Sequence, residues 1–448
     1  MAGYTDFVVA VDLGTSHLTG IVGRRNESGK LNVLARETEE GNTGIRRGCV
    51  FNIGETAAKL SSLVRKLESR LEGGRIAKVY IGVGGQSVRA IDHVVSHELG
   101  NGEEEVTEEV LDLLHEACRA YKPEGLDVLD IVPPAYRVDG KKALNPVGVP
   151  CRNIEAHFKL IVGRPSLRKH VLNVAERAHV RVAGIVISPL MQAEAVLTDN
   201  EKELGCALVD FGAGVTSLTI YKGGRLQFLN VIPLGARLIT RDLTGLNLVE
   251  AEAERVKVTY GAAEVDKEDT STVQVNGEDS TGLSDIRLMD INTIVEARAK
   301  EILENVLVRL ERPEVENMLG GGVIITGGGA NLRKVAELMK KRLKREMRFA
   351  TLRKGLFEQG AEAGDDPTNA VAVGILMLPD AENCARRTAP PVAAPQPAAP
   401  QPSAVPPPVR STPPVQKNNP AEKKKKEAGK MKDTLKGWMG GLFSDEQM

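Results

Sequence analysis

The sequence predicts an α/β fold of two lobes, and three glycine turns placed at the ends of apolar strands are the observations that predict it. The first two turns have the same construction, an apolar run ending in Asp and then Gly with small or hydroxyl neighbours. They read Val8-Val9-Ala10-Val11-Asp12-Leu13-Gly14-Thr15-Ser16 and Ala207-Leu208-Val209-Asp210-Phe211-Gly212-Ala213-Gly214-Val215. The third, Gly327-Gly328-Gly329, ends the apolar run 323–326 and precedes a helix predicted over 333–345. A repeated strand and turn far apart in the chain is expected where two similar lobes face each other.

The first two turns also predict a ligand. Apolar residues resume after each turn, at 18–22 and 218–221, so each is expected to be a β-hairpin. Glycine lets the backbone approach a ligand closely, and the N–H groups of such a turn hold phosphate oxygens. The predicted phosphate-binding residues are Gly14, Thr15, Ser16, Gly212, Ala213, Gly214 and Val215. Asp12 and Asp210 are hard oxygen ligands, and they are predicted to hold Mg²⁺ through water.

Composition limits the class of protein. At 448 residues the chain exceeds one hydrophobic core, so several domains are expected. From Ala385 onward it has eleven Lys or Arg and five Asp or Glu, so this end carries +6 and the preceding body −7. An acidic body argues against nucleic acid as its partner, and the basic end favours an anionic surface. The five cysteines have no regular spacing, and neither a signal peptide nor an apolar run of about 20 residues occurs. A cytoplasmic protein is predicted.

Changes in the pattern of apolar and polar residues along the chain predict the domain boundaries. Helical spacing at 56–71, 168–178 and 189–197 alternates with buried strands at 78–83 and 182–187. Short strands and an acidic helix start interrupt this alternation between 86 and 162, and a polar hairpin around 274–284 interrupts it again. We therefore expect a lobe one core (1–85 and 163–200), an inserted subdomain (86–162), a lobe two core (201–245 and 319–384), a second insertion (246–318), a linker with a Lys run (385–426) and a terminal helix (427–448).

The third turn, Gly327 to Ala330, resembles the adenosine-binding motif of the actin, Hsp70 and sugar-kinase superfamily, which carries two phosphate loops in the same order. Within that superfamily the chain resembles the FtsA family of bacterial cell-division proteins over essentially its whole length. The matching residues are Gly44-Ile45-Arg46-Arg47-Gly48, Asn145-Pro146-Val147-Gly148, Glu201-Lys202-Glu203-Leu204-Gly205 and the pair Glu254 and Lys257. Residues 86–162 stand where that family has its own inserted subdomain in lobe one.

The resemblance implies an ATP-binding protein that forms filaments with itself and tethers FtsZ to the cytoplasmic face of the inner membrane at the division septum. It places Glu254 and Lys257 at the ribose and Gly327, Gly328, Gly329 and Ala330 at the adenosine. It assigns residues 86–162 to later division proteins and the FtsZ tail to the second insertion, where Arg298 and Lys300 could meet an acidic peptide. Read without the family, Glu254 with Lys257 and Arg298 with Lys300 are ordinary charges of solvated helix faces.

The end of the chain predicts membrane attachment independently. Residues 388–420 hold about half of the 23 prolines, which lack amide donors, so an extended spacer of at most about 100 Å is expected. After the run Lys423 to Lys426, apolar residues recur at helical spacing and form one stripe, with lysines on or beside the opposite face. The stripe is Met431, Leu435, Trp438, Met439, Leu442 and Phe443, and the lysines are Lys432 and Lys436. Such a helix favours an anionic membrane surface, with a protein groove as the alternative.

Whether ATP is hydrolysed stays open. Second phosphate loops of the family often carry Asp where this chain has Ser217, so a carboxylate near the phosphates or metal is missing. Gln192 precedes the second loop, roughly where actin-like ATPases place a water-orienting glutamine, and a polar residue on a partly buried helix is an equal interpretation. His17 follows the first loop and could approach a phosphate or lie on the surface. A pilus-assembly adaptor of the same fold and a sugar-kinase-like phosphotransferase are the alternative functions.

Overall fold

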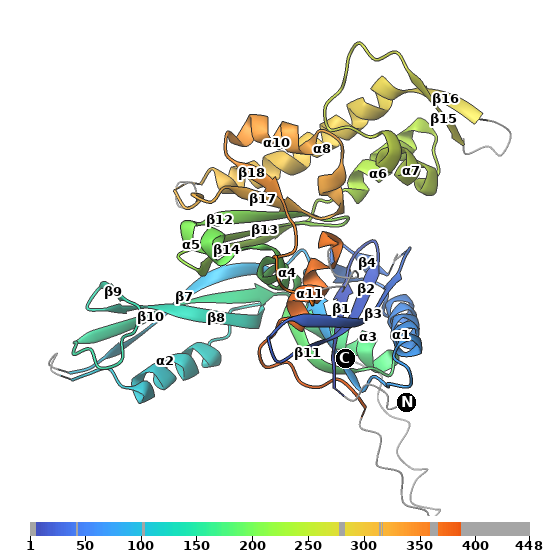
Figure 1. Ribbon diagram of the computed structural model, residues 1–448. Helices are drawn as coiled ribbons and strands as arrows, with labels where there is room; N and C mark the ends of the chain where they lie inside the picture. Colours follow the sequence, from blue (N-terminus) through green and yellow to red (C-terminus); the bar gives the residue numbers. More distant parts are fainter. Residues whose placement is uncertain are drawn as a thin grey trace, which may run out of the picture. The chain divides into compact units, whose positions relative to one another are not determined.

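The computed structural model of the chain describes residues 6–41, 44–100, 104–276, 283–312, 315, 317–358 and 366–386. A five-stranded and a nine-stranded sheet, with helices packed on them, organise this part of the chain (Figure 1). The α/β fold class predicted from the sequence is thereby confirmed. The relative placement of the two sheets matters because the predicted site residues come from both.

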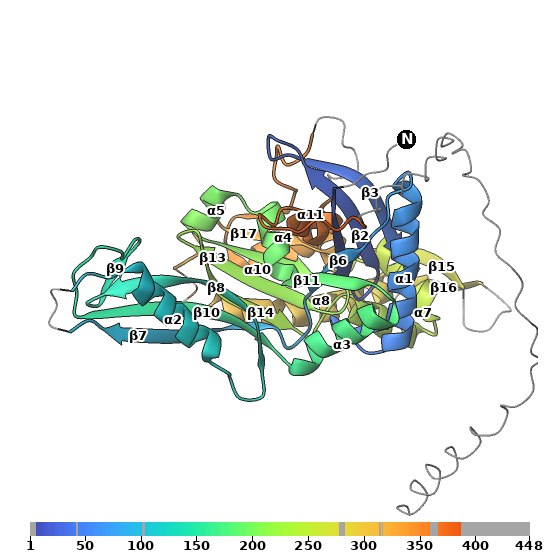
Figure 2. The same ribbon diagram turned by 90° about the horizontal axis from the view of Figure 1, so that it is seen from below.

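Lobe one contains the five-stranded sheet, in the order β11-β6-β1-β2-β3. Its strands are β1 (Val8–Leu13), β2 (Leu18–Arg25), β3 (Leu31–Glu39), β6 (Lys78–Val83) and β11 (Arg181–Ile187). The first predicted hairpin is β1 with β2, while β6 and β11 run parallel to β1. Helices α1 (Ile53–Arg70) and α3 (Pro165–Arg177) lie side by side along this lobe (Figure 2). Helix α1 begins where the Asn52 side chain accepts a hydrogen bond from the Glu55 N–H.

Lobe two contains one end of the nine-stranded sheet, in the order β18-β17-β12-β13-β14-β7-β10-β8-β9. The strands of the lobe are β12 (Cys206–Phe211), β13 (Thr216–Lys222), β14 (Arg225–Ile232), β17 (Val323–Thr326) and β18 (Met347–Phe349). The second predicted hairpin is β12 with β13, and β17 runs parallel to β12. Helices α4 (Ser188–Val196) and α5 (Asp199–Leu204) connect lobe one to β12.

Residues 89–163 form the other end of the nine-stranded sheet. They comprise β7 (Arg89–Glu98), α2 (Glu108–Ala120), β8 (Asp127–Val138), β9 (Lys141–Ala143) and β10 (Asn153–Gly163). Every second residue of β10 is buried from Asn153 to Leu160, because α2 covers one face of this sheet with its apolar side, and the remaining residues up to Gly163 are all buried. Strand β7 joins β14 through the single pair Arg89–Asn230, so the insertion extends the sheet of lobe two although the chain enters it from lobe one. Sequence periodicity does not reveal this junction.

The second insertion packs helices against a two-stranded hairpin. It contains α6 (Arg237–Leu243), the 3-10 turn η1 (Thr244–Leu246), α7 (Glu250–Tyr260), β15 (Thr272–Asn276), β16 (Leu283–Arg287) and α8 (Leu288–Leu310). Its own small core includes Ile239, Val256, Val275 and Ile291. The polar hairpin predicted around 274–284 corresponds to β15 and β16, and its turn lies outside the described residues.

The chain returns to lobe one after β18, which corrects the assignment of residues 319–384 to lobe two. Phe357 bridges to Leu31 of β3, and α11 (Ala370–Leu376) packs on β1, β2 and α4. All seven residues of α11 are buried, and a helix that is apolar all round needs neighbours on every side. The close crossing of α11 with α4 supplies them, and a Cβ at Gly374 would overlap the carbonyl of Met191.

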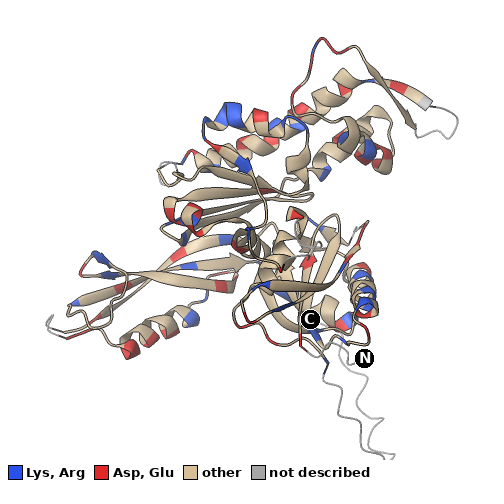
Figure 3. Cartoon of the chain, in the orientation of Figure 1, with Lys and Arg blue, Asp and Glu red and all other residues tan. Residues whose placement is uncertain are grey.

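The helix after the third glycine turn is shorter than predicted. Residues Gly328–Asn331 form the 3-10 turn η2, and α10 runs from Val335 to Leu343 instead of from 333 to 345. Lys334 and Lys344 flank α10 in the left-handed conformation, at φ 61° and 51°, which ends helical hydrogen bonding at both sides. Figure 3 shows Lys and Arg gathered on α10.

The last described residues are bonded into lobe one as a short extended segment. The N–H of Cys384 donates to the Phe7 carbonyl (2.8 Å), and the N–H of Ala77 donates to the Cys384 carbonyl (2.8 Å). The N–H of Arg386 donates to the Arg75 carbonyl (2.7 Å). Residues 384–386, the last that the structure describes, are called the exit segment. The predicted linker from residue 387 onward and the terminal helix lie outside the described residues, and among the residues that are described no helix has the length and apolarity to cross a bilayer.

Candidate functional site

One cavity of about 420 Å³ between the two lobes collects the predicted site residues. Its lining includes both phosphate-loop candidates, both predicted metal-binding carboxylates, Gln192, the Glu254 and Lys257 pair, and the third glycine turn. The predicted residues on it are Asp12, Gly14, Thr15, Ser16, Gln192, Asp210, Gly212, Ala213, Gly214, Val215, Glu254, Lys257, Gly327, Gly328 and Gly329. Ala330 is the exception, because η2 turns its side chain into the core of lobe two beside Phe211.

The two hairpin turns have the same local geometry. A Cβ on Gly14 would lie 2.6 Å from the His17 carbonyl oxygen, and one on Gly212 would lie 2.8 Å from the Val215 carbonyl oxygen. Each turn therefore folds back on itself at a position that only glycine fits. The turns place backbone N–H groups of both lobes around one space, which suits an anionic ligand with several phosphate oxygens.

Asp12 and Asp210 both line this cavity, and a positive charge on the nearby His17 side chain would partly offset the negative charge of Asp12. Burial raises the pKa of both carboxyls, and the negative charge of Asp12 contributes to raising the pKa of Asp210 to about 7. The Ser188 hydroxyl donates to Asp12 (3.0 Å). Two carboxylates that repel each other fit a divalent cation, whose charge would relieve the repulsion. The described part of the chain has no group of three or more His, Cys, Asp or Glu arranged so that it could hold a metal ion, so water or phosphate oxygens would complete the coordination here.

Gln192 lies on α4 beside these carboxylates and is 5% exposed. Its side chain bonds to Asp210, and this bond opposes the increase of the Asp210 pKa. The Gln192 Oε1 has no hydrogen-bond partner among the described residues. Because an unpaired buried carbonyl oxygen is unfavourable, the cavity has an acceptor ready for a water molecule or a ligand donor.

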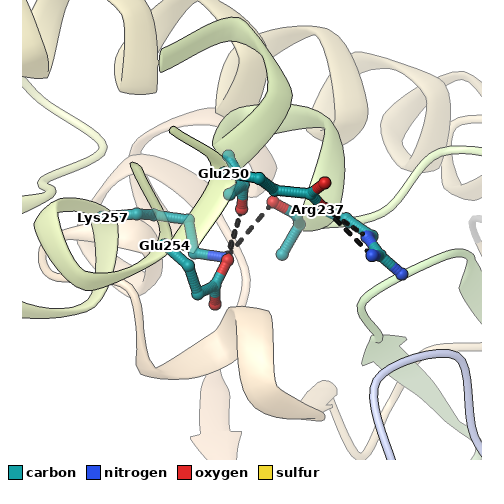
Figure 4. Close-up of polar contacts among 6 residues, drawn as sticks. Arg237, Glu250, Glu254 and Lys257 are labelled. Atoms are coloured by element: carbon teal, nitrogen blue, oxygen red, sulfur yellow. Dashed lines mark hydrogen bonds and ion pairs between the residues drawn. The ribbon is translucent and has the colours of Figure 1, made fainter. Parts of the chain in front are cut away.

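The other end of the cavity is built by α6, α7 and η2. Glu254 accepts hydrogen bonds from the Thr240 hydroxyl (2.5 Å) and from Lys257 Nζ (2.7 Å), and Lys257 Nζ also donates to Thr240 (2.9 Å). Figure 4 shows this cluster beside the Arg237 and Glu250 ion pair, whose Nη2 and Oε1 atoms are 2.9 Å apart. The Lys257 side chain is mostly buried while that of Glu254 is half exposed, so Glu254 is the more accessible of the two.

Several lining residues were missed in the sequence. Ser188 and Pro189 start α4, Pro367 and Thr368 precede α11, and Val258 follows Lys257 on α7. The first four come from segments that carry no glycine motif, and only the tertiary fold brings them to the cavity. Val258 could have been found, since it is four residues after Glu254 on one helix face. His17 and Ser217 line the cavity as well.

Arg298 and Lys300, the predicted contacts for an acidic peptide, lie on α8 away from this cavity. Arg298 pairs with Asp242 (2.5 Å) and with Glu301, while Lys300 pairs with Glu296 (2.5 Å). Both cations already have carboxylate partners within the chain, so a peptide would have to compete with these ion pairs.

Two lobes closing on such a cavity define the class of actin-like proteins, and comparison with solved structures agrees. The chain superposes on a protein of a "PilM-PilN type IV pilus biogenesis complex" with a TM-score of 0.58 and 18% identity, covering 83% of this chain and 97% of that one. It superposes on "MreB5 of Spiroplasma citri bound to ADP" with a TM-score of 0.50 and 14% identity, covering 83% and 95%. These likenesses establish the fold.

Sequence comparison gives the family. The family model for "Cell division protein FtsA" matches residues 207–374, and that for "SHS2 domain inserted in FTSA" matches residues 85–162. The FtsA of Porphyromonas gingivalis is 34% identical over 343 residues, 76% of this chain and 72% of its own length. That of Bacillus subtilis is 31% identical over 356 residues, 77% and 79% of the two chains. The chain belongs to the FtsA family of cell division proteins, as the sequence motifs predicted.

Proposed function

We propose that this protein binds Mg-ATP in the interlobe cavity, assembles into filaments with copies of itself, and tethers FtsZ to the cytoplasmic face of the inner membrane at the septum. The observation that carries the nucleotide part is the convergence of two matching glycine turns and two buried carboxyls with raised pKa values on one cavity. A solved relative of the same fold is named as bound to ADP, which supports this assignment. Membership of the FtsA family supports the role in division and makes the pilus adaptor and the sugar kinase weaker alternatives.

Within the cavity each group has a proposed role. The backbone of Gly14 to Ser16 and of Gly212 to Val215 holds the phosphates, and Asp12 and Asp210 hold Mg²⁺ through water. Glu254 approaches the ribose beside Lys257, and the turn 327–329 receives the adenosine, with Ala330 supporting that turn from the core. The metal would neutralise phosphate charge, while the chain itself positions the polyphosphate between two lobes.

Gln192 is the proposed water-positioning residue, because its Oε1 is unpaired and its amide is held by Asp210. With no further carboxylate at Ser217, we expect slow turnover, below about one ATP per second per protomer. Gln192→Ala should lower single-turnover phosphate release at least about tenfold while changing ATP affinity less than about threefold. A loss of affinity in parallel with the rate would contradict this role.

Membrane attachment is assigned to the stripe Met431, Leu435, Trp438, Met439, Leu442 and Phe443, with Lys432 and Lys436 beside anionic headgroups. Burial of these side chains in a bilayer is favourable, but ordering so short a helix costs much of the gain, so one tail binds weakly. Several tails in one filament bind together firmly.

Co-sedimentation with vesicles of anionic phospholipid tests this proposal. The full-length chain should pellet at least about tenfold more than a chain ending at residue 427, and Mg-ATP should increase the difference through assembly. FtsZ should pellet only with the full-length chain. Trp438→Glu should act like the truncation, whereas Asp433→Asn, on the opposite helix face, should retain binding. Equal sedimentation of the full-length and truncated chains would overturn the membrane assignment.

The FtsZ tail and later division proteins are assigned to the second insertion and to residues 86–162, respectively. Arg298 and Lys300 stay the proposed contacts for the acidic tail of FtsZ, in exchange for their internal partners Asp242 and Glu296. Recruitment of FtsZ to vesicles in the same sedimentation experiment measures the first of these contacts directly.

A further inference from the structure

Besides lining the proposed phosphate site, the Thr15 side chain contacts two other turns of the chain. Its side chain is 8% exposed, and its Oγ1 accepts a hydrogen bond from the Gly48 N–H at 3.1 Å. The same side chain packs against the second phosphate turn, since a Cβ on Gly214 would lie 2.5 Å from Thr15 Oγ1 and 2.7 Å from Thr15 Cγ2. Thr15 is therefore held between a lobe two loop and the turn that contains Gly48.

That turn belongs to the hairpin 44–50, formed by β4 (Ile45–Arg46) and β5 (Cys49–Val50). Gly48 adopts φ +69°, and a Cβ there would lie 2.7 Å from the Gly84 carbonyl oxygen. The N–H of Gln86 donates to the Arg47 carbonyl (3.1 Å), and a Cβ at Gly85 would overlap the Cys49 sulfur. Contacts this close leave no free volume, so a displacement of the hairpin must also displace residues 84–86.

Residues 84–88 are the root of the inserted subdomain. The N–H of Val231 on β14 donates to the Val88 carbonyl (3.2 Å), one residue before β7 begins. The N–H of Arg164, where the chain leaves the subdomain, donates to Ser87 Oγ (3.1 Å). Both connections of the subdomain to the rest of the chain therefore meet at the segment that the hairpin 44–50 contacts.

We propose that Thr15 is a positioning residue that couples occupation of the cavity to the root of the inserted subdomain, through the hairpin 44–50. When a polyphosphate draws the turns of Gly14 and Gly214 together, the Thr15 side chain moves with Gly214, and its hydroxyl pulls Gly48 through their hydrogen bond. The hairpin then moves residues 84–88 and changes the orientation of β7. This inference rests on the proposed nucleotide site and adds to it a route by which the insertion senses nucleotide.

Hydrogen exchange of the full-length protein tests the coupling, with and without Mg²⁺ and a non-hydrolysable ATP analogue. Thr15→Val keeps the shape of the side chain and removes the hydroxyl, whereas Thr15→Ser keeps the hydroxyl. Ser16→Ala is the matched control, because Ser16 lies on the same turn but its side chain contacts His17 and not the hairpin. The Ser16 Oγ and His17 Nδ1 atoms are 2.9 Å apart. Thermal unfolding of each variant verifies that it is folded.

In the free protein, Thr15→Val should accelerate exchange at residues 46–49 and 84–88 about fivefold, the effect of one lost hydrogen bond. Thr15→Ser and Ser16→Ala should leave this exchange as in the wild type. With the analogue, the wild type should become protected both at 212–216 and at 84–92, and Thr15→Val only at 212–216.

Three results overturn the proposal or separate it from the proposed function. If hydrogen exchange at residues 84–88 is unchanged in nucleotide-free Thr15→Val, Thr15 is not the residue that couples the cavity to the subdomain. Protection of 212–216 without any change at 84–92 in the wild type would show that the site fills without signalling. Absence of protection at 212–216 would instead refute the nucleotide site, and with it the signal, while the free-protein comparison would still decide whether Thr15 holds the hairpin.

Discussion

Asp210→Asn is expected to weaken Mg-ATP binding about 100-fold and at the same time to stabilise the empty protein. The carboxylate is needed to hold the metal, but in the absence of a cation its burial and the nearby charge of Asp12 are unfavourable, as its pKa of about 7 indicates. An amide of the same shape removes the repulsion and also removes the metal ligand. Function and stability are therefore opposed at this residue.

The sign of the pH dependence follows from the direction of the shift. The folded-state pKa lies above the unfolded value of 3.8, so folding disfavours the ionised form. Below pH 3.8 the Asp210 carboxyl is protonated in both states and does not lower the free energy of unfolding. As the pH rises, its ionisation destabilises the folded state increasingly, and this destabilisation levels off above about pH 7. The stability difference between Asp210→Asn and the wild type should therefore increase from pH 5 to pH 7.5 and reach a few kcal/mol, at most about 4.

Urea unfolding of the nucleotide-free proteins across this pH range measures the difference, and titration with a fluorescent ATP analogue measures the affinity. Asp112→Asn is the matched control, because Asp112 is exposed on α2. This substitution removes the same charge and should change neither the stability nor the affinity for Mg-ATP. Retention of Mg-dependent affinity by Asp210→Asn would exclude Asp210 from the metal site.

Gly374→Ala is expected to destabilise the protein by about 3 kcal/mol or more, although alanine is the better helix former by about 1 kcal/mol. The new Cβ would overlap the carbonyl of Met191, and a backbone atom in the middle of α4 cannot move aside as a flexible side chain can. Relief requires α11 and α4 to separate, which opens the core where the two lobes are connected.

Chemical denaturation of Gly374→Ala beside Gly245→Ala gives the test. Gly245 lies in η1 without positive φ, and a Cβ added there would have no neighbouring atom within 4 Å. The substitution at Gly245 should therefore change stability by less than about 0.5 kcal/mol. Equal stability of the two variants would mean that the helix crossing adapts without cost.

The parts of the site that follow from local sequence were predictable, and those that follow from long-range packing were not. A strand ending in Asp and followed by a glycine turn encodes its own geometry, so the turns at Gly14 and Gly212 could be identified residue by residue. Ser188 and Thr368 reach the same cavity only because α4 and α11 cross, and no short-range pattern encodes that crossing.

The boundaries of the lobes illustrate the same limit. The order of segments along the chain suggests that the residues after β17 and β18 belong to lobe two. In the structure, α11 instead packs its apolar side chains on β1 and β2 of lobe one. Similarly, a single residue pair, Arg89 with Asn230, joins β7 to β14, although the two residues are far apart in the sequence. Such pairings depend on which strands lie at the sheet edges in the folded chain, and local sequence does not specify this.

The exit segment 384–386 has a mechanical consequence. Its three backbone hydrogen bonds tie one short extended segment to Phe7, just before β1, and to Arg75 and Ala77, just before β6. If a force is applied along this segment, we expect the three bonds to be loaded together as shear instead of opening one after another. Such a force would pass from residues 384–386 to the starts of β1 and β6, so we expect lobe one to carry tension without being unravelled from this segment.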